Sequence, residues 1–242
     1  MEEALKLADY LPISFKNPKD QEYVAFLWDA FHTNYEHGKY QFAFLAYHML
    51  TMSFIYFNIW QIRQAKPDDF AKGLIGFARD EASLLSATSP FVFSTVNERT
   101  VLRLLKLIGC DNCMVGTYAK LVDDRNDAAH PNGNIFYSTQ KALDTKIGEI
   151  LRVAGEVQEH SAPIVLQMYG NFLFDNWDRE VREYPDDDDQ VREVLLHNGY
   201  FSLEDVRLCR GFDVESLPDS DARAEQEQLH KAFVAMFEDI DG

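Results

Sequence analysis

Cysteine and basic residues are scarce in this chain of 242 residues. Its three cysteines, Cys110, Cys113 and Cys209, form an odd set, and no secretory signal peptide precedes them. We therefore expect a reducing, cytoplasmic location and no disulfide scaffold. The 23 Lys and Arg residues face 40 Asp and Glu residues, a formal net charge of −17. This acidity argues against broad, charge-driven wrapping of nucleic acid, but it leaves room for a small basic site.

Alternating strand patterns, glycine-rich phosphate loops and internal repeats are also missing from the sequence. Hydrophobic residues, in contrast, make up 46 % of the chain, which is enough for a sizeable core. Apolar residues recur at three- and four-residue steps, which is typical of amphipathic helices. The sequence therefore predicts an all-α fold, a helical bundle with an acidic helical C-terminal extension. The main expected helices cover residues 20–35, 40–64, 67–86, 111–130, 139–159, 163–181 and 221–237.

One segment, Tyr40 to Trp60, contains no Asp, Glu, Lys or Arg and is long enough to span a bilayer. Polar residues such as Gln41 and His48 interrupt it, and its aromatic residues are scattered instead of grouped in belts at the ends. We therefore expect a buried central helix of the bundle and no membrane insertion.

The negative charge is concentrated in the last third of the chain. Residues 1–170 carry 16 basic and 20 acidic side chains, whereas residues 171–242 carry 7 basic and 20 acidic ones. The expected domains are accordingly a nearly neutral helical body over 1–170 and an acidic extension over 171–242. Such asymmetry is typical either of a solvated helical surface or of an interaction segment.

The most distinctive motif consists of Arg125, the Asn126 that follows it directly, and His130, with four residues between Arg125 and His130. The motif ends a helix that follows a long hydrophobic helix, and over about residues 20–167 the chain resembles the HEPN superfamily. That resemblance implies a metal-independent endoribonuclease without cofactor, of the kind found in toxin–antitoxin, phage-defence and RNA-processing systems. It also implies a homodimer in which two copies of the motif line one cleft, with an antitoxin or defence complex as a further partner.

The residue types suit RNA cleavage. A histidine such as His130 can exchange protons near neutral pH, and Arg125 can hold two phosphate oxygens at once. Asn126 lies four residues before His130 and shares its helix face, whereas Arg125 and His130 are about 140° apart on an ideal helix. A dimer removes this difficulty if Arg125 of one copy works with His130 of the other. Asp124 and Asp127 are expected to support the site by favouring a protonated His130 and holding Arg125.

Two other pairs in the chain have a similar spacing, Arg192 with His197 and Arg223 with His230. Arg192 is followed by Glu193 and Arg223 by Ala224, in contrast to Asn126 after Arg125. Both pairs also lie in the acidic extension, which would repel phosphate.

Three functions stay open. The first is the ribonuclease. The second is a non-catalytic HEPN-like interaction or regulatory protein whose acidic extension binds a partner, mimics nucleic acid or restrains the site. The third is a small-molecule sensor with a cavity between aromatic-rich helices. The spacing of Cys110 and Cys113 matches half of a zinc site, but the other two ligands are missing, so we expect these residues to pack and to bind no metal.

Overall fold

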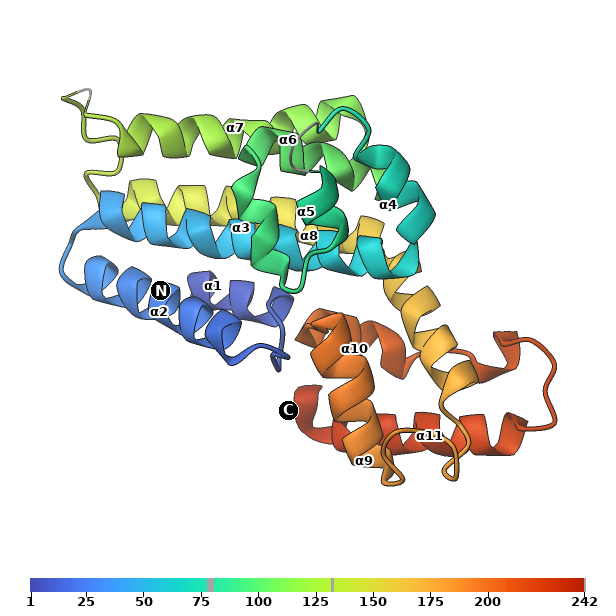
Figure 1. Ribbon diagram of the computed structural model, residues 1–242. Coiled ribbons are helices and arrows are strands. Elements are labelled where there is room, and N and C mark those ends of the chain that lie inside the picture. Colours follow the sequence, from blue (N-terminus) through green and yellow to red (C-terminus); the bar gives the residue numbers. More distant parts are fainter. Residues whose placement is uncertain (78–80, 132, 242) are drawn as a thin grey trace.

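The computed structural model describes residues 1–77, 81–131 and 133–241, and within these ranges it contains helices and no strand, apart from one isolated bridge between Pro12 and Ser202 (Figure 1). The all-α prediction is confirmed. The helices of the body are α1 (Glu2–Leu5), η1 (Lys6–Tyr10), α2 (Pro18–Glu36), α3 (Tyr40–Ala65), α4 (Pro67–Gly73), α5 (Glu81–Leu85), η3 (Pro90–Thr95), α6 (Glu98–Leu102), η4 (Arg103–Ile108), α7 (Asn112–Ala129) and α8 (Gln140–Asp175). The extension contributes α9 (Asp187–Gln190), η5 (Val191–His197), α10 (Leu203–Arg210), η6 (Val214–Ser216), α11 (Arg223–Met236) and η7 (Glu238–Asp241).

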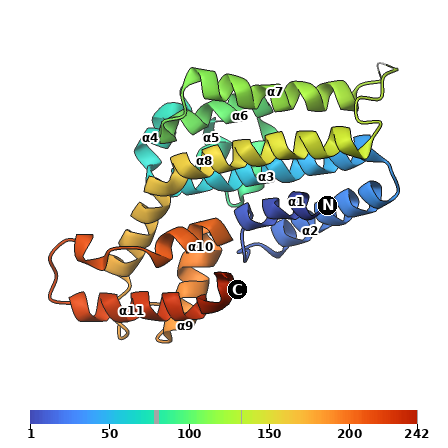
Figure 2. The ribbon, with the colours of Figure 1, turned by 180° about the vertical axis from the view of Figure 1, so that it is seen from behind.

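Helix α3 is the centre of the bundle. It runs between α2 and α8, and α7 covers it from a further side (Figures 1 and 2). The helix is long and apolar enough to cross a membrane by length and composition, yet 83 % of its most apolar window is buried inside the protein. A helix that is apolar on all sides needs cover on most of its surface, and neighbouring helices provide it here except at a few positions such as Phe42 and Met49. The expected buried central helix is confirmed.

Helix α8 differs from the prediction, because Pro163 lies inside it and does not break it. Proline lacks the N–H that would bond the carbonyl of Glu159, which costs one hydrogen bond. Ile164 and Val165 are both buried immediately after the proline, and their burial on the continuous helix offsets that loss. The predicted helix over 67–86 is instead divided into α4 and α5, and the turn after α4 contains Gly76 with a φ of 99°.

The acidic extension folds around its own small core. Tyr169 of α8, Phe201 and Phe233 are fully buried at its centre. The division between the two cores falls near Val165, inside the continuous helix α8. The extension lies beyond the C-terminal half of α8, whereas the loop after α7 lies at the opposite end of the body (Figures 1 and 2). This placement does not support the idea that the extension covers the motif.

Asp205 of α10 ties the extension to the body. Its carboxylate accepts hydrogen bonds from the side chains of Gln61 (2.9 Å) and Gln158 (2.6 Å) and from the backbone N–H of Ser202 (2.9 Å). The D205A substitution would remove the acceptor that these donors share, although Gln61 would keep its hydrogen bond to the carbonyl of Gly199 (3.3 Å). We therefore expect it to lower the free energy of unfolding by about 2–4 kcal/mol. Chemical denaturation measures this. D213A, which removes an exposed cap, is the control and is expected to cost about 1 kcal/mol or less; equal losses would contradict the role of Asp205.

Candidate functional site

Helix α7 presents the motif at its C-terminal end. Asp111 caps the start of the helix by accepting a hydrogen bond from the N–H of Met114 (2.8 Å). The helix ends at Ala129, and His130 adopts an extended conformation with a ψ of 144°. The following residue is Pro131, which disfavours the helical conformation at the position before it. His130 is thereby held at the helix end, with its N–H donating to the carbonyl of Asn126 (3.0 Å).

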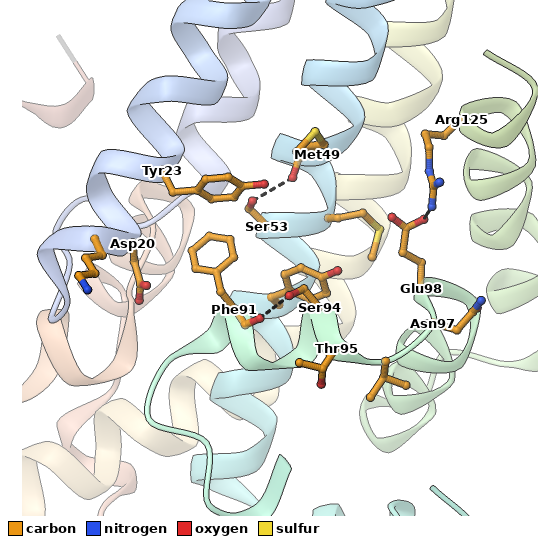
Figure 3. A pocket seen from close by; sticks show the side chains of 14 residues that line it. Asp20, Tyr23, Met49, Ser53, Phe91, Ser94, Thr95, Asn97, Glu98 and Arg125 are labelled. Atoms are coloured by element: carbon orange, nitrogen blue, oxygen red, sulfur yellow. Dashed lines mark hydrogen bonds and ion pairs between the residues drawn. The ribbon is translucent and has the colours of Figure 1, made fainter. Parts of the chain in front are cut away.

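Arg125 is fixed by a carboxylate from another helix. Its Nη2 lies 2.6 Å from Oε2 of Glu98, at the start of α6 (Figure 3). The same oxygen lies 3.3 Å from Nε2 of His48 on α3. His48 is buried and Glu98 is largely so. Burial alone would raise the pKa of Glu98, but the hydrogen bonds and positive charges of His48 and Arg125 outweigh it and hold that pKa below its ordinary value. We call these three residues the Arg125 cluster.

Of the two aspartates expected to support the motif, Asp124 pairs with Nζ of Lys146 on α8 (2.9 Å), and Asp127 is exposed. The supporting acid that the sequence missed is Glu98, which the sequence pattern presents only as the start of a helix. Asn97 caps that helix by accepting a hydrogen bond from the N–H of Arg99 (3.0 Å).

Arg125 and His130 do not meet within one chain. Arg125 faces α6 and the junction with α3, whereas His130 is exposed at the helix end. Asn126, between them in sequence, is half-buried. The angular separation expected on a helix is therefore present, and a single copy brings together only Arg125 and its supporting carboxylate.

A cavity of about 680 Å³ opens beside Arg125 (Figure 3). Its walls come from α2, α3, η3, α6 and α7, which contribute among others Tyr23, Met49, Phe91, Glu98 and Arg125. His130 is not among the described residues that line it. The cavity thus connects to the arginine of the motif and not to its histidine.

An exposed apolar face continues from this cavity toward His130. Met49 and Phe42 lie seven residues apart on the same face of α3, and Phe42 is 60 % exposed. Gln41 ties this end of α3 to the motif, because its side chain donates to the carbonyl of Ala128 (2.9 Å) and accepts from the N–H of Phe136 (2.8 Å). Ile135 and Phe136 are exposed on the loop that follows His130. Large apolar side chains left in water beside a motif are typical of a protein interface.

The residues of the two rival pairs are engaged in contacts within the extension and in the contact of His230 with Tyr169 of α8. Arg223 donates to the carbonyls of Leu217 (2.8 Å) and Pro218 (3.1 Å), and Nδ1 of His230 lies 2.6 Å from the hydroxyl of Tyr169. Burial lowers the pKa of His230. In the other pair, Arg192 binds Asp189 (3.1 Å) and His197 binds Glu193 (2.8 Å).

No metal centre is evident in the described part of the chain, where no three His, Cys, Asp or Glu side chains are placed to hold an ion. Cys110 is buried and Cys113 is exposed, and both are free thiols. Burial raises the pKa of Cys110 to about 11, which keeps its thiol protonated.

No family model, curated protein or solved structure matches this chain. A function must therefore be inferred from the site itself, which combines a fixed arginine, an exposed histidine at a helix end, a cavity and an adjoining apolar face.

Proposed function

We propose that this protein is a metal-independent endoribonuclease of the HEPN type that acts as a cytoplasmic homodimer. The observation that carries the proposal is the state of Arg125: it is the first residue of an Arg-x4-His motif, it is fixed by Glu98, and it lies at the mouth of an open cavity. A toxin or abortive-infection effector is the biological class that the resemblance to HEPN domains favours.

The chemistry requires three groups at one phosphate. A base removes the proton from the 2′-hydroxyl, whose oxygen attacks the adjacent phosphorus. The bond from phosphorus to the 5′ oxygen then breaks, and an acid protonates that oxygen, so that the products are a cyclic phosphate and a 5′-hydroxyl. His130 is the group that exchanges protons, and Arg125 stabilises the charge on the phosphate oxygens. Asn126 is available to bind the substrate on the face of His130.

A second copy of the chain supplies what one copy lacks. Because Arg125 and His130 point to different sides of α7, a two-fold axis through the exposed face around Phe42 and Phe136 would bring His130 of each copy toward Arg125 of the other. Covering these aromatic side chains also removes apolar surface from water, which favours association. The catalytic unit is therefore composed of both chains.

We assign the acidic extension to recruitment of a partner and not to cleavage. Among its contacts with the body, those of Trp60 and Gln61 lie near the C-terminal end of α3, whereas the motif lies beside the start of that helix. A basic surface on an antitoxin or on a component of a defence complex is its complementary partner.

The H130A substitution tests the proposal directly. We expect it to lower the rate of cleavage of single-stranded RNA by about a hundredfold or more, because proton transfer by a positioned side chain contributes about that factor. The exposed position of His130 means that folding is not affected. The assay measures product formation from a labelled oligonucleotide, with and without EDTA.

His37 provides the matched control. It is also an exposed histidine at the end of a helix, and its Nδ1 lies 2.8 Å from the carbonyl oxygen of Thr33. We expect H37A to cleave RNA at the wild-type rate and EDTA to have no effect. Equal activity of H130A and the wild type, or absence of cleavage by the wild type, would sink the ribonuclease proposal.

A further inference from the structure

The cavity beside Arg125 has a wall of aromatic rings. Phe91 packs edge-to-face against Tyr23, with centroids 5.0 Å apart at 85°, and against Tyr56, with centroids 6.2 Å apart at 79°. Tyr23 and Phe91 are only half-buried, and the exposed side chain of Met49 borders the same space (Figure 3). Rings that meet edge-to-face leave part of their own faces uncovered, and sulfur and aromatic surfaces suit a flat, polarisable ligand.

One hydrogen-bond acceptor in the cavity is unused. Glu98 contacts both His48 and Arg125 through Oε2, while its Oε1 has no partner among the described residues and lies on the cavity side of the carboxylate (Figure 3). A carboxylate oxygen can only accept hydrogen bonds. The ligand therefore needs an N–H or O–H group on its edge, as the amino and imino groups of nucleobases provide.

The same end of the cavity offers donors for an anion. Arg125 uses Nη2 for Glu98, but its side chain stays 31 % exposed and lines the cavity. The guanidinium has five N–H donors, so it can bind a phosphate oxygen while it keeps its bond to Glu98. At the opposite end, the carboxylate of Asp20 is already engaged by the hydroxyls of Ser89 (2.9 Å) and Tyr200 (2.8 Å). The anionic part of a ligand therefore belongs at Arg125.

We propose that this cavity is a nucleotide subsite, in which one unstacked base lies against Tyr23 and Phe91, an N–H of its edge bonds Oε1 of Glu98, and its phosphate lies at Arg125. The inference rests on the proposed function, because the phosphate at Arg125 is taken to be the one that is cleaved. It adds that the substrate RNA must be single-stranded at this nucleotide. RNA-binding proteins recognise single strands by stacking splayed-out bases on aromatic side chains in this way.

Filling the cavity tests the subsite. Ser94 lines it from η3, is exposed, and donates its hydroxyl to the carbonyl of Phe91 (2.7 Å). S94W would place a large ring in the space meant for the base. Ser86 is the matched control, because it is also exposed and also donates to a backbone carbonyl, that of Ala82 (2.7 Å), but does not line the cavity. Both substitutions are made in full-length H130A protein, so that RNA is bound but not cut.

The measurement is binding of a fluorescent single-stranded RNA of eight nucleotides at low salt, in parallel with calorimetric titration of the four nucleoside 5′-monophosphates. We expect S94W to weaken RNA binding by about tenfold or more, the loss of one stacked base, and S86W to bind as the parent does. Binding of RNA much more tightly than of any mononucleotide identifies the ligand as a nucleotide within RNA. Comparable binding of a mononucleotide that S94W abolishes identifies a free nucleotide at the same subsite.

Unchanged binding in S94W, or equal weakening in S94W and S86W, would overturn the subsite. The wild-type cleavage assay separates this result from a failure of the nuclease proposal. Cleavage with an unaltered KM in S94W removes the subsite and keeps the nuclease. Loss of nucleotide binding in S94W, with no cleavage by the wild type, keeps the subsite and removes the nuclease.

Discussion

Replacing Arg125 with alanine is expected to lower the rate of RNA cleavage by about a thousandfold, because the substitution removes the charge that stabilises the phosphate in the transition state. R125K is expected to recover only a small part of this loss, since a lysine keeps the charge but not the planar fork that binds two oxygens. R152A is the control. Arg152 is an exposed arginine of α8 that pairs with Glu156, and we expect the R152A protein to cleave RNA at the wild-type rate. Circular dichroism and thermal unfolding establish that each variant is folded.

Mixing two inactive variants gives a sharper result. R125A and H130A protein, mixed and allowed to exchange subunits, would form mixed dimers in which one Arg125 and one His130 remain on opposite chains. Random exchange would restore about a quarter of the wild-type activity if each dimer has two equivalent sites. Native mass spectrometry shows whether mixed dimers form. Mixed dimers without activity would contradict a site shared between two chains, even if each single substitution abolishes cleavage.

The sequence predicted helices well where their formation depends on interactions between residues close together in the chain. The uncharged run from Tyr40 to Trp60 was expected to be a buried central helix, and the structure has it as part of α3. Ser202 and Asp205 have the three-residue spacing of a capping box, and both hydrogen bonds of that box are present at the start of α10. Such features depend on groups within one turn, so that residue type and spacing determine them.

Tertiary packing decided the features that the sequence did not reveal. Pro163 reads as a helix break, yet burial on both sides keeps α8 continuous. The Arg125 cluster joins His48, Glu98 and Arg125 from three helices that are far apart in sequence. No spacing rule connects such positions, and only the packing of α6 between α3 and α7 brings them together. The motif was therefore visible in the sequence, whereas its supporting carboxylate and its cavity were not.

Placing a charge on the apolar face is expected to separate the two copies and, with them, the two halves of the site. Phe42 is 60 % exposed in one chain, and a two-fold interface would bury both copies of it. F42E introduces two unpaired charges into that interface, so we expect the dimer dissociation constant to rise by about a hundredfold or more. Activity would then fall steeply as the protein is diluted and return at high protein concentration.

Val181 supplies the control for this experiment. It is 80 % exposed on the acidic extension, which is not part of the apolar face around Phe42 and Phe136, so V181E adds the same charge outside the proposed interface. Analytical ultracentrifugation measures the association of both variants, and the RNA assay is run on the same samples. A monomeric F42E that cleaves RNA at the wild-type rate would show that one chain is sufficient, and a dimeric, fully active F42E would place the interface elsewhere. Dissociation and loss of activity at the same protein concentration would tie catalysis to the pairing of Arg125 with the partner's His130.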